Sequence, residues 1–559
     1  MARVSGGEIV VRTLLQAGVG TLFGINGAHV DAVYQAALDH GLPIVDTRHE
    51  MNAGHAAEGY ARVRNTLGVA VLTAGGGFTN AVTSMANAFL DRTPVLYIAG
   101  SGMLALDQAN TLQAGIDQVA IATPVTKWAH RITRPELIPR ILARAIRTAL
   151  AGPRGPVMVD IPWDVLADQV EEPDLTAEFV GTAGAAPSAP PAAVEEILSL
   201  LAGAQRPVVL AGSEVARGGA GAELRAFAEA VSVPILADYE GLGLLSGSPA
   251  GFGLVQSLFG LAAGQRPDVV VMLGLRFGLM TGHGSGALIP HQARVVQVDS
   301  DARELGHLQP VATTVLADPG AVVRQLHETA LARGQQYRQD HARWWQQLRA
   351  HIARRQEMVA AQVVQDGRIH PYEAVAAIAG SVPAGTVVVA DGALTYLWLS
   401  ETIPAAGVSA YLCHGYLGSM GVGMGVALGA QAAARDLPVV LVTGDGAVGY
   451  SLAEFDTMVR AQLPVVVVVL NNRAWGATLH AQELMLGKDR IVSNRLENGS
   501  YSEVARALGA DGATITDLAE LAPALAKAIR SQRPTCLDVQ VSLDPIPPEE
   551  RVIMGGSPF

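Results

Sequence analysis

Two oxygen-bearing side chains follow two apolar runs between residues 438 and 472. Asp445 lies in a Gly-Asp-Gly turn after residues 439–442, and Asn472 follows residues 465–470. Parallel strands end at one edge of a sheet, so these side chains can converge. Carboxylate and amide oxygens suit a hard cation, and a glycine turn before a helix suits an anion. We therefore predict a diphosphate held through Mg²⁺.

The elements that position this pair form a strand–turn–helix–strand unit. The helical part places Leu452, Phe455, Met458 and Val459 on one face, and Pro464 ends it. The turn alone is equally compatible with an incidental aspartate, because such turns are common. The complete unit, in which 24 residues separate Gly-Asp-Gly from Asn-Asn, resembles the diphosphate motif of the thiamine diphosphate enzymes, and this resemblance favours the functional interpretation.

The first third of the chain predicts a related architecture. Thr73 precedes Pro94 by 21 positions, as Thr443 precedes Pro464, and each interval holds a glycine-rich turn and a helix. We expect two copies of one α/β domain, of which only the second has the metal-type aspartate and asparagine. The expected helices are 8–17, 30–39 and 53–62, and the expected strands are 21–24, 43–46, 68–73 and 95–99.

The whole chain is predicted to be α/β, with three doubly wound parallel-sheet domains. The middle domain lacks a clean GxGxxG, so we expect a structural role without a nucleotide, although a nucleotide-binding domain is the alternative. The tail from residue 545 is expected to be irregular, on the surface or over an active-site mouth. The boundaries are 1–168, a linker at 169–190, a middle domain at 191–340, a helical linker at 341–365, and 366–559.

Composition excludes several classes of function. The 559 residues carry a net charge of −12 without a basic cluster, so nucleic acid is not expected as a partner. Hydrophobic residues make up 50%, but the apolar runs are of strand length, so no membrane span is predicted. No export signal is visible, and the two cysteines form no CxxC. We expect a cytoplasmic protein without disulfides or structural zinc.

Four further polar residues could take part in chemistry. Glu50 follows a predicted strand and could share a proton with a ligand nitrogen, or simply favour a helix dipole. His29 lies at another strand-to-helix turn and could move protons, although a single histidine is more often structural. Gln113 and His414 stand in glycine-flanked segments and could orient oxygens, although from local sequence alone a surface glutamine and a structural histidine are the more common interpretations. Motifs for a serine triad, an HExxH zinc site or a P-loop are absent from the sequence.

Together these features resemble the thiamine diphosphate-dependent decarboxylase/carboligase superfamily. Within it, the chain is similar to the benzaldehyde lyases over essentially its whole length. The matching segments include DTRHEMNAGHAAEGYAR, TLQAGIDQVAIATPVTKWAHR, DGALTYLWLSE, CHGYLGSMGVGMG and RLENGSY.

The resemblance implies thiamine diphosphate and Mg²⁺, bound between the first domain of one subunit and the last domain of another. A homo-oligomer is therefore expected, at least a dimer and by resemblance a homotetramer. Glu50 would protonate the pyrimidine ring. The implied metal ligands are Asp445, Asn472 and the Ala474 carbonyl; the diphosphate would touch Gly446, Ala447, Ala393 and Leu394; Met420 and the Gly418 carbonyl would hold the rings.

The implied reaction cleaves 2-hydroxy ketones such as (R)-benzoin into aldehydes such as benzaldehyde, and ligates aldehydes in reverse. His29 would carry the proton, and Gln113, Tyr396 and His414 would orient oxygens. The implied substrate pocket consists of Ala28, Leu112, Trp163 and Ala477. Ala481 departs from the resemblance, since a bulky aromatic residue stands there in benzaldehyde lyases, and its loss should open the channel.

Two alternatives remain. The first is a 2-oxo acid decarboxylase or an acetolactate synthase-like enzyme. A pyruvate-type decarboxylase should show an adjacent His-His pair, which this sequence lacks, and a flavin-dependent synthase would need a ligand in the middle domain. The second is a non-catalytic nucleotide-binding or sensory α/β protein, which would bind no thiamine diphosphate.

Overall fold

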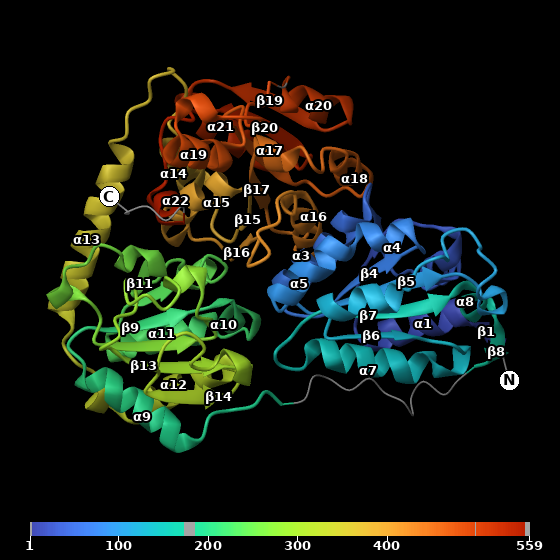
Figure 1. Cartoon of the computed structure of the whole chain (residues 1–559), viewed down its shortest axis with the longest axis horizontal. Helices are drawn as coiled ribbons and strands as arrows, with labels where there is room; N and C mark the ends of the chain where they lie inside the picture. Colours follow the sequence, from blue (N-terminus) through green and yellow to red (C-terminus); the bar gives the residue numbers. More distant parts are fainter. Residues whose placement is uncertain (1–2, 173–184, 498, 554–559) are drawn as a thin grey trace.

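A computed structural model describes residues 3–172, 185–497 and 499–553. Three α/β domains surround the centre of the molecule, each built on a six-stranded parallel sheet (Figure 1). This confirms the predicted fold class. The linker expected at 169–190 falls partly outside the described residues. A small antiparallel pair, β1 (Arg3–Ser5) and β8 (Gln169–Glu171), joins the two ends of the first domain.

The first and last sheets share one strand order. The first runs β3 (Ile44–Asp46), β2 (Leu22–Gly24), β4 (Gly68–Leu72), β5 (Val95–Ser101), β7 (Val157–Pro162), β6 (Trp128–Arg131). The last runs β16 (Ala410–Cys413), β15 (Val387–Asp391), β17 (Val439–Gly444), β18 (Val466–Asn471), β20 (Thr535–Gln540), β19 (Asp511–Ile515). Numbered within each domain, both orders read 2-1-3-4-6-5, which confirms the predicted duplication.

The middle sheet has a different order, 3-2-1-4-5-6, which is typical of dinucleotide-binding folds. Its strands are β11 (Gly251–Leu254), β10 (Ile235–Ala237), β9 (Pro207–Ala211), β12 (Val269–Leu273), β13 (Arg294–Asp299) and β14 (Thr313–Leu316). Its main helices are α9 (Pro191–Gly203), α10 (Ser213–Arg217), α11 (Gly221–Val231) and α12 (Pro319–Ala332).

Helices cover both faces of the outer two sheets, as buried valine-rich strands require. Those of the first domain are α1 (Gly6–Gln16), α2 (Asp31–Asp39), α3 (Glu50–Arg64), α4 (Gly76–Asn80), α5 (Val82–Leu90), α6 (Gln118–Ala122), α7 (Ile138–Leu150) and α8 (Trp163–Ala167). Those of the last are α14 (Pro371–Ser381), α15 (Ala393–Ser400), α16 (Gly423–Ala433), α17 (Asp445–Val448), α18 (Glu454–Arg460), α19 (Gly476–Leu486), α20 (Tyr501–Ala507), α21 (Leu518–Ser531) and α22 (Pro548–Ile553).

Three details differ from the sequence prediction. The helix expected before Pro464 is two helices, α17 and α18. Gly449 caps the end of α17, and the Ser451 hydroxyl in the turn that follows donates to Asn52 of α3 at 3.1 Å, which holds this turn against the first domain. Helix α3 begins at Glu50, three residues early, where the His49 ring accepts the Met51 N–H as a cap. The tail contains α22, although its last residues, 554–559, lie outside the described part.

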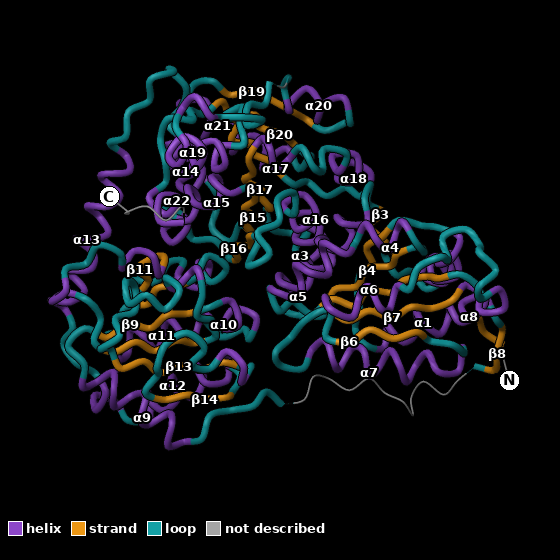
Figure 2. The backbone as a smooth tube through the Cα atoms, viewed as in Figure 1, coloured by secondary structure: helices purple, strands orange, loops and turns teal. Residues whose placement is uncertain are grey.

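The first and last domains are joined by α3 and α16, which pack backbone against backbone. A Cβ atom at Gly429 would lie 1.8 Å from the Ala56 carbonyl oxygen, and one at Gly59 would lie 2.2 Å from that of Val426. Glycine is therefore required at both crossings. Helix α13 (Ala342–Ala360) runs along the outside of the middle and last domains (Figure 2). None of the helices in the described ranges is long and apolar enough to cross a membrane.

Candidate active site

One cavity opens at the carboxyl ends of β15, β17 and β18 in the last domain. It collects nine of the residues predicted to hold the cofactor, the metal or the substrate. These are Ala393, Leu394, Met420, Asp445, Gly446, Ala447, Asn472, Ala474 and Ala477. Eight of them follow the three neighbouring parallel strands β15, β17 and β18, and Met420 follows β16, which pairs with β15. The sheet itself therefore brings them together.

The two predicted metal ligands converge in this cavity. The Ala474 N–H donates both to Asp445 Oδ2 at 3.1 Å and to Asn472 Oδ1 at 3.0 Å. Burial raises the pKa of Asp445 to about 7, because a carboxylate without a nearby cation is costly to charge. A bound cation would relieve that cost.

The chemistry of the donor set suits Mg²⁺ bound to a diphosphate. Among the described residues, no three histidines, cysteines, aspartates or glutamates form a metal cage. The protein instead offers one carboxylate, one amide oxygen and a backbone carbonyl. Magnesium commonly completes such a set with phosphate and water oxygens. The residues present therefore fit the group that the sequence predicted.

Close backbone packing shapes the rest of the cavity. A Cβ atom at Gly446 would lie 2.4 Å from the Trp475 ring, so any residue larger than glycine would clash with the ring at this position. Gly392 has a φ of +91°, and it leads into the N-terminus of α15, which lies at the cavity. Helix N-termini offer unsatisfied N–H groups to anions, as a diphosphate requires.

Sequence reasoning missed two aromatic residues at this site. Trp475 lines the cavity beside the Gly446 turn. The Tyr501 hydroxyl donates to the Asp445 backbone carbonyl at 3.0 Å and so helps fix the same turn. Neither residue belongs to the strand-end pattern; for Tyr501 the available signal was its place in the matching segment RLENGSY.

Two of the predicted catalytic residues meet at one loop of the first domain, residues 73–77. Glu50 is buried at the start of α3, and its Oε2 accepts the Asn80 side-chain N–H at 2.9 Å. A Cβ atom at Gly77 would lie 3.2 Å from the other oxygen, Oε1. His29 Nδ1 lies 3.4 Å from Thr73 Oγ1. Both side chains therefore border the glycine turn after β4.

Gln113 lies against the same loop. A Cβ atom at Gly75 would approach the Gln113 backbone to about 3 Å, and Gly75 has a φ of +63°. The neighbouring Leu112 is 85% exposed, and Trp163, at the start of α8, is 42% exposed. The first domain thus exposes two large apolar side chains, and Ala28 is exposed as well.

Burial lowers the pKa of both candidate histidines, His29 and His414, so each ring is neutral at pH 7. A neutral imidazole can accept a proton and return it. The ring nitrogens of His414 are buried and have no hydrogen-bond partner among the described residues. Tyr396 packs against this ring, with centroids 4.7 Å apart.

The first domain holds the backbone on both sides of His414. Asp91 accepts the N–H groups of Gly415 and Tyr416, each at 3.2 Å. Arg62 donates to the Cys413 carbonyl at 2.9 Å. The position of the histidine is thus set by residues more than 300 positions earlier in the chain, which no local pattern reveals.

The remaining predicted residues do not line this cavity. Within the described residues, its walls come from residues 371–545 alone, so none belongs to the first domain. Tyr396, His414 and Gly418 lie outside the lining, and Ala481 lies one turn beyond Ala477 on α19. A single chain therefore presents two separate groups of predicted site residues, one on each outer domain.

Comparison with known proteins identifies the same three-part organisation. The thiamine pyrophosphate enzyme N-terminal binding domain matches residues 4–121, the central domain matches 194–326, and the C-terminal binding domain matches 391–539. The acetolactate synthase large subunit IlvG of Mycobacterium tuberculosis is 31% identical over 95% of both chains. Acetolactate synthase isozyme 2 of Escherichia coli is 30% identical over 96% of both chains.

A third relative, 2-hydroxyacyl-CoA lyase 2 of Bos taurus, is 29% identical over 95% of this chain and 88% of its own. These relatives support the superfamily and do not single out the benzaldehyde lyase branch. Taken with the cavity geometry, they lead to one identification: the chain belongs to the thiamine diphosphate enzymes, and its cofactors are thiamine diphosphate and Mg²⁺.

Proposed function

We propose that this enzyme is a carbon–carbon lyase and carboligase, which cleaves 2-hydroxy ketones such as (R)-benzoin into aldehydes and joins aldehydes in the reverse direction. The observation that carries the proposal lies on the first domain. The large apolar side chains of Leu112 and Trp163 are exposed there, and burial lowers the pKa of His29, so this predicted proton carrier is neutral.

These apolar and neutral groups favour uncharged, aromatic substrates. A 2-oxo acid brings a carboxylate, which is costly to bury without a cation or several donors. Benzoin and benzaldehyde carry no charge and present aromatic rings. The exposed Trp163 and Leu112 on the first domain offer apolar area for such rings.

The proposed site is completed by a second copy of the chain. The last-domain cavity supplies groups for the diphosphate and the metal, whereas Glu50, His29 and Gln113 belong to the other outer domain. Joining the first domain of one copy to the last domain of another would unite them. We therefore expect a homo-oligomer, at least a dimer and, from the family resemblance, a tetramer.

In this proposal each group has a defined task. Thiamine diphosphate, when bound, supplies an electron sink for the carbon that loses its bond. Glu50 holds a proton at the pyrimidine nitrogen. Neutral His29 takes the hydroxyl proton of the 2-hydroxy ketone and returns it to the product. Gln113, Tyr396 and His414 orient the substrate oxygens, and Ala477, with Ala481 beyond it, leaves room for the rings.

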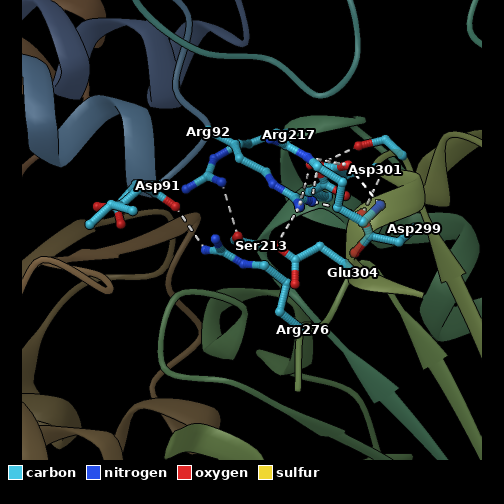
Figure 3. Close-up of polar contacts among 12 residues, drawn as sticks. Asp91, Arg92, Ser213, Arg217, Arg276, Asp299, Asp301 and Glu304 are labelled. Atoms are coloured by element: carbon cyan, nitrogen blue, oxygen red, sulfur yellow. Dashed lines mark hydrogen bonds and ion pairs between the residues drawn. The ribbon is translucent and has the colours of Figure 1, made fainter. Parts of the chain in front are cut away.

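An acetolactate synthase-like or 2-oxo acid decarboxylase activity is the second candidate, because most of the relatives named above are acetolactate synthases. A flavin-dependent form would need a dinucleotide in the middle domain. The carboxyl edge of that sheet instead carries Arg92 of the first domain, which pairs with Asp299 and Glu214 at 2.9 Å and reaches Asp301 and Glu304 (Figure 3).

These crevice residues suit a dinucleotide poorly. Four carboxylates surround Arg92, and they would repel a diphosphate if it displaced the arginine. Asp238, which follows β10 where a ribose-binding carboxylate would stand, accepts the Gly241 N–H at 2.7 Å and so serves its own turn. This arrangement supports the flavin-independent proposal.

The test is a direct comparison of substrates. The purified enzyme, loaded with thiamine diphosphate and Mg²⁺, is incubated separately with benzoin, benzaldehyde and pyruvate, and products are separated by chiral chromatography. We expect benzaldehyde from benzoin, benzoin from benzaldehyde, and slower conversion of pyruvate. Faster formation of acetolactate or acetaldehyde from pyruvate would favour the second candidate, and failure to bind the cofactor would favour a non-catalytic protein.

A further inference from the structure

A second cavity, of about 340 Å³, lies where all three domains meet, and we call it the junction cavity. Helix α3 of the first domain, helices α10 and α11 of the middle domain, and strand β16 of the last domain all contribute walls. Its volume is within the range that takes a small-molecule ligand. None of its lining residues lines the candidate active site.

The junction cavity has an excess of positive charge. Arg62, Arg217 and Arg225 line it, against a single carboxylate, Glu240. Glu240 is shared, since it lies 3.1 Å from Arg62 and 2.8 Å from Arg217. The excess contrasts with the chain as a whole, whose net charge is −12.

Two guanidinium groups at this place have no acidic partner. Arg225 donates to the Leu244 carbonyl at 2.9 Å and forms no ion pair with any carboxylate in the described ranges. The same is true of Arg154, which donates to the side chain of Asn65 on the cavity wall and to the Arg217 carbonyl. Guanidinium groups that are partly buried without a carboxylate are the usual setting for binding an anion.

The acidic residues buried behind the wall of the junction cavity carry less negative charge than their number suggests. Burial raises the pKa of Asp238 to about 7 and raises the pKa of Asp91 well above its ordinary value. Glu58 stays paired with Arg62 on the buried side, at 3.6 Å. The positive excess at the cavity wall therefore persists near neutral pH.

We propose that the junction cavity is a binding site for a compact polyanion that carries phosphate or carboxylate groups. Arg225 would supply its charge-assisted hydrogen bonds, and the Arg62–Glu240–Arg217 cluster would form the floor. Arg154 does not line the cavity; it would hold Asn65 of the wall in place and add positive charge behind it. The proposal concerns the border of the middle domain, not its dinucleotide crevice, which Arg92 fills. It does not depend on which substrate the active site takes.

The structure also indicates what the ligand would do. A molecule in the junction cavity touches all three domains at once, so its binding would oppose their separation. A ligand that binds only the folded assembly raises its stability with concentration. We therefore expect the thermal unfolding midpoint to rise with concentration of the anion and to reach saturation as binding does.

The experiment is calorimetric titration of the enzyme saturated with thiamine diphosphate and Mg²⁺, so that the diphosphate site is already filled. Inorganic phosphate and succinate are titrated separately, with chloride at equal ionic strength as the reference. We expect one site per chain for at least one anion, and at least about tenfold weaker binding in Arg225→Gln, the loss of one charge-assisted contact. Phosphate binding alone or succinate binding alone would support the site and identify its chemistry.

A matched variant separates site binding from general charge. Arg140→Gln removes an exposed arginine from α7 and should leave the affinity unchanged. Arg154→Gln removes a guanidinium group behind the wall and its contact with Asn65, and it should weaken binding less than Arg225→Gln does. The proposal would be overturned if neither anion bound beyond the chloride reference, or if Arg140→Gln and Arg225→Gln weakened binding equally.

Discussion

The first and last domains have the same strand order but different residues at the same edge. When Pro94 and Pro464 are aligned, Gly75 and Gly102 stand where Asp445 and Asn472 stand. In the proposed site the strand ends of the last domain hold the metal, whereas the two glycines of the first domain offer no ligand side chain. The shared strand order gives both domains an equivalent sheet edge, and the residue at each of two strand ends determines what that edge can bind.

The comparison extends to the helices. Helix α3 follows the second strand of its domain, as α16 follows the second strand of the other, and these equivalent helices pack against each other. The contact therefore resembles the self-complementary interface of a twofold dimer, contained within one chain. At the start of α3 stands Glu50, and at the start of α16 stands Gly423. Each copy has thus kept a different half of the proposed chemistry.

The largest expected effect comes from removing the acid of the first copy. Glu50→Gln keeps the shape and the Asn80 contact but cannot share a proton with the cofactor, so turnover should fall by about 10²–10⁴-fold. Steady-state benzoin cleavage measures the loss, and circular dichroism checks the fold. The exposed Glu136→Gln should retain full activity. Unchanged activity in Glu50→Gln would mean that the first copy contributes no chemistry.

The next largest effect is expected from removing a proposed metal ligand of the last domain. Asp445→Ala should weaken retention of thiamine diphosphate and Mg²⁺ by roughly 100-fold, because one oxygen ligand and its charge are lost. Gel filtration followed by metal and cofactor analysis measures it. Asp436→Ala, an exposed aspartate just before β17, is the control. If Asp445→Ala retained all of its thiamine diphosphate and Mg²⁺, the proposed metal-binding difference between the two domains would be wrong.

A pH profile tests the proton carrier. Burial lowers the pKa of His29, so the ring stays neutral below the ordinary histidine value of about 6.5, and cleavage should decline only at more acidic pH. His29→Ala should be slower by about 10²-fold and should lose this acid limb. His130→Ala, on the same domain, should keep both rate and limb. An unaltered limb in His29→Ala would assign it to another group.

The smallest effect is expected at the substrate end of α19. Ala481→Phe should narrow the channel, so kcat/KM should fall several-fold for benzoin and little for small aliphatic acyloins. A series of substrates of increasing size measures the difference. Ala519→Phe, on the exposed side of α21, should change neither. Equal effects on all substrates would place Ala481 outside the channel.

The sequence predicted those features that depend on neighbours along the chain. Apolar runs marked most strands of the first domain and the two that frame the Gly-Asp-Gly turn, and the residues predicted after β17 and β18 line the last-domain cavity. The break between α17 and α18 escaped prediction because the turn between them is held by a contact with Asn52, almost 400 positions away. Trp475, and the hydrogen bonds from Gly415 and Tyr416 to Asp91, were missed for the same reason, since tertiary contacts leave no periodic pattern.

Asp91 and Arg92 are adjacent in the sequence, yet their side chains contact different domains. Asp91 accepts two N–H groups from the last domain, and Arg92, whose φ is +52°, reaches the carboxylates of the middle domain. This restricts how such a protein can be recombined. If the first domain is replaced by that of a relative, its residues at these two positions must fit both the last-domain backbone and the middle-domain carboxylates. We therefore expect chimaeras divided at the linkers to fold poorly unless both of these contact surfaces come from the same relative as the first domain.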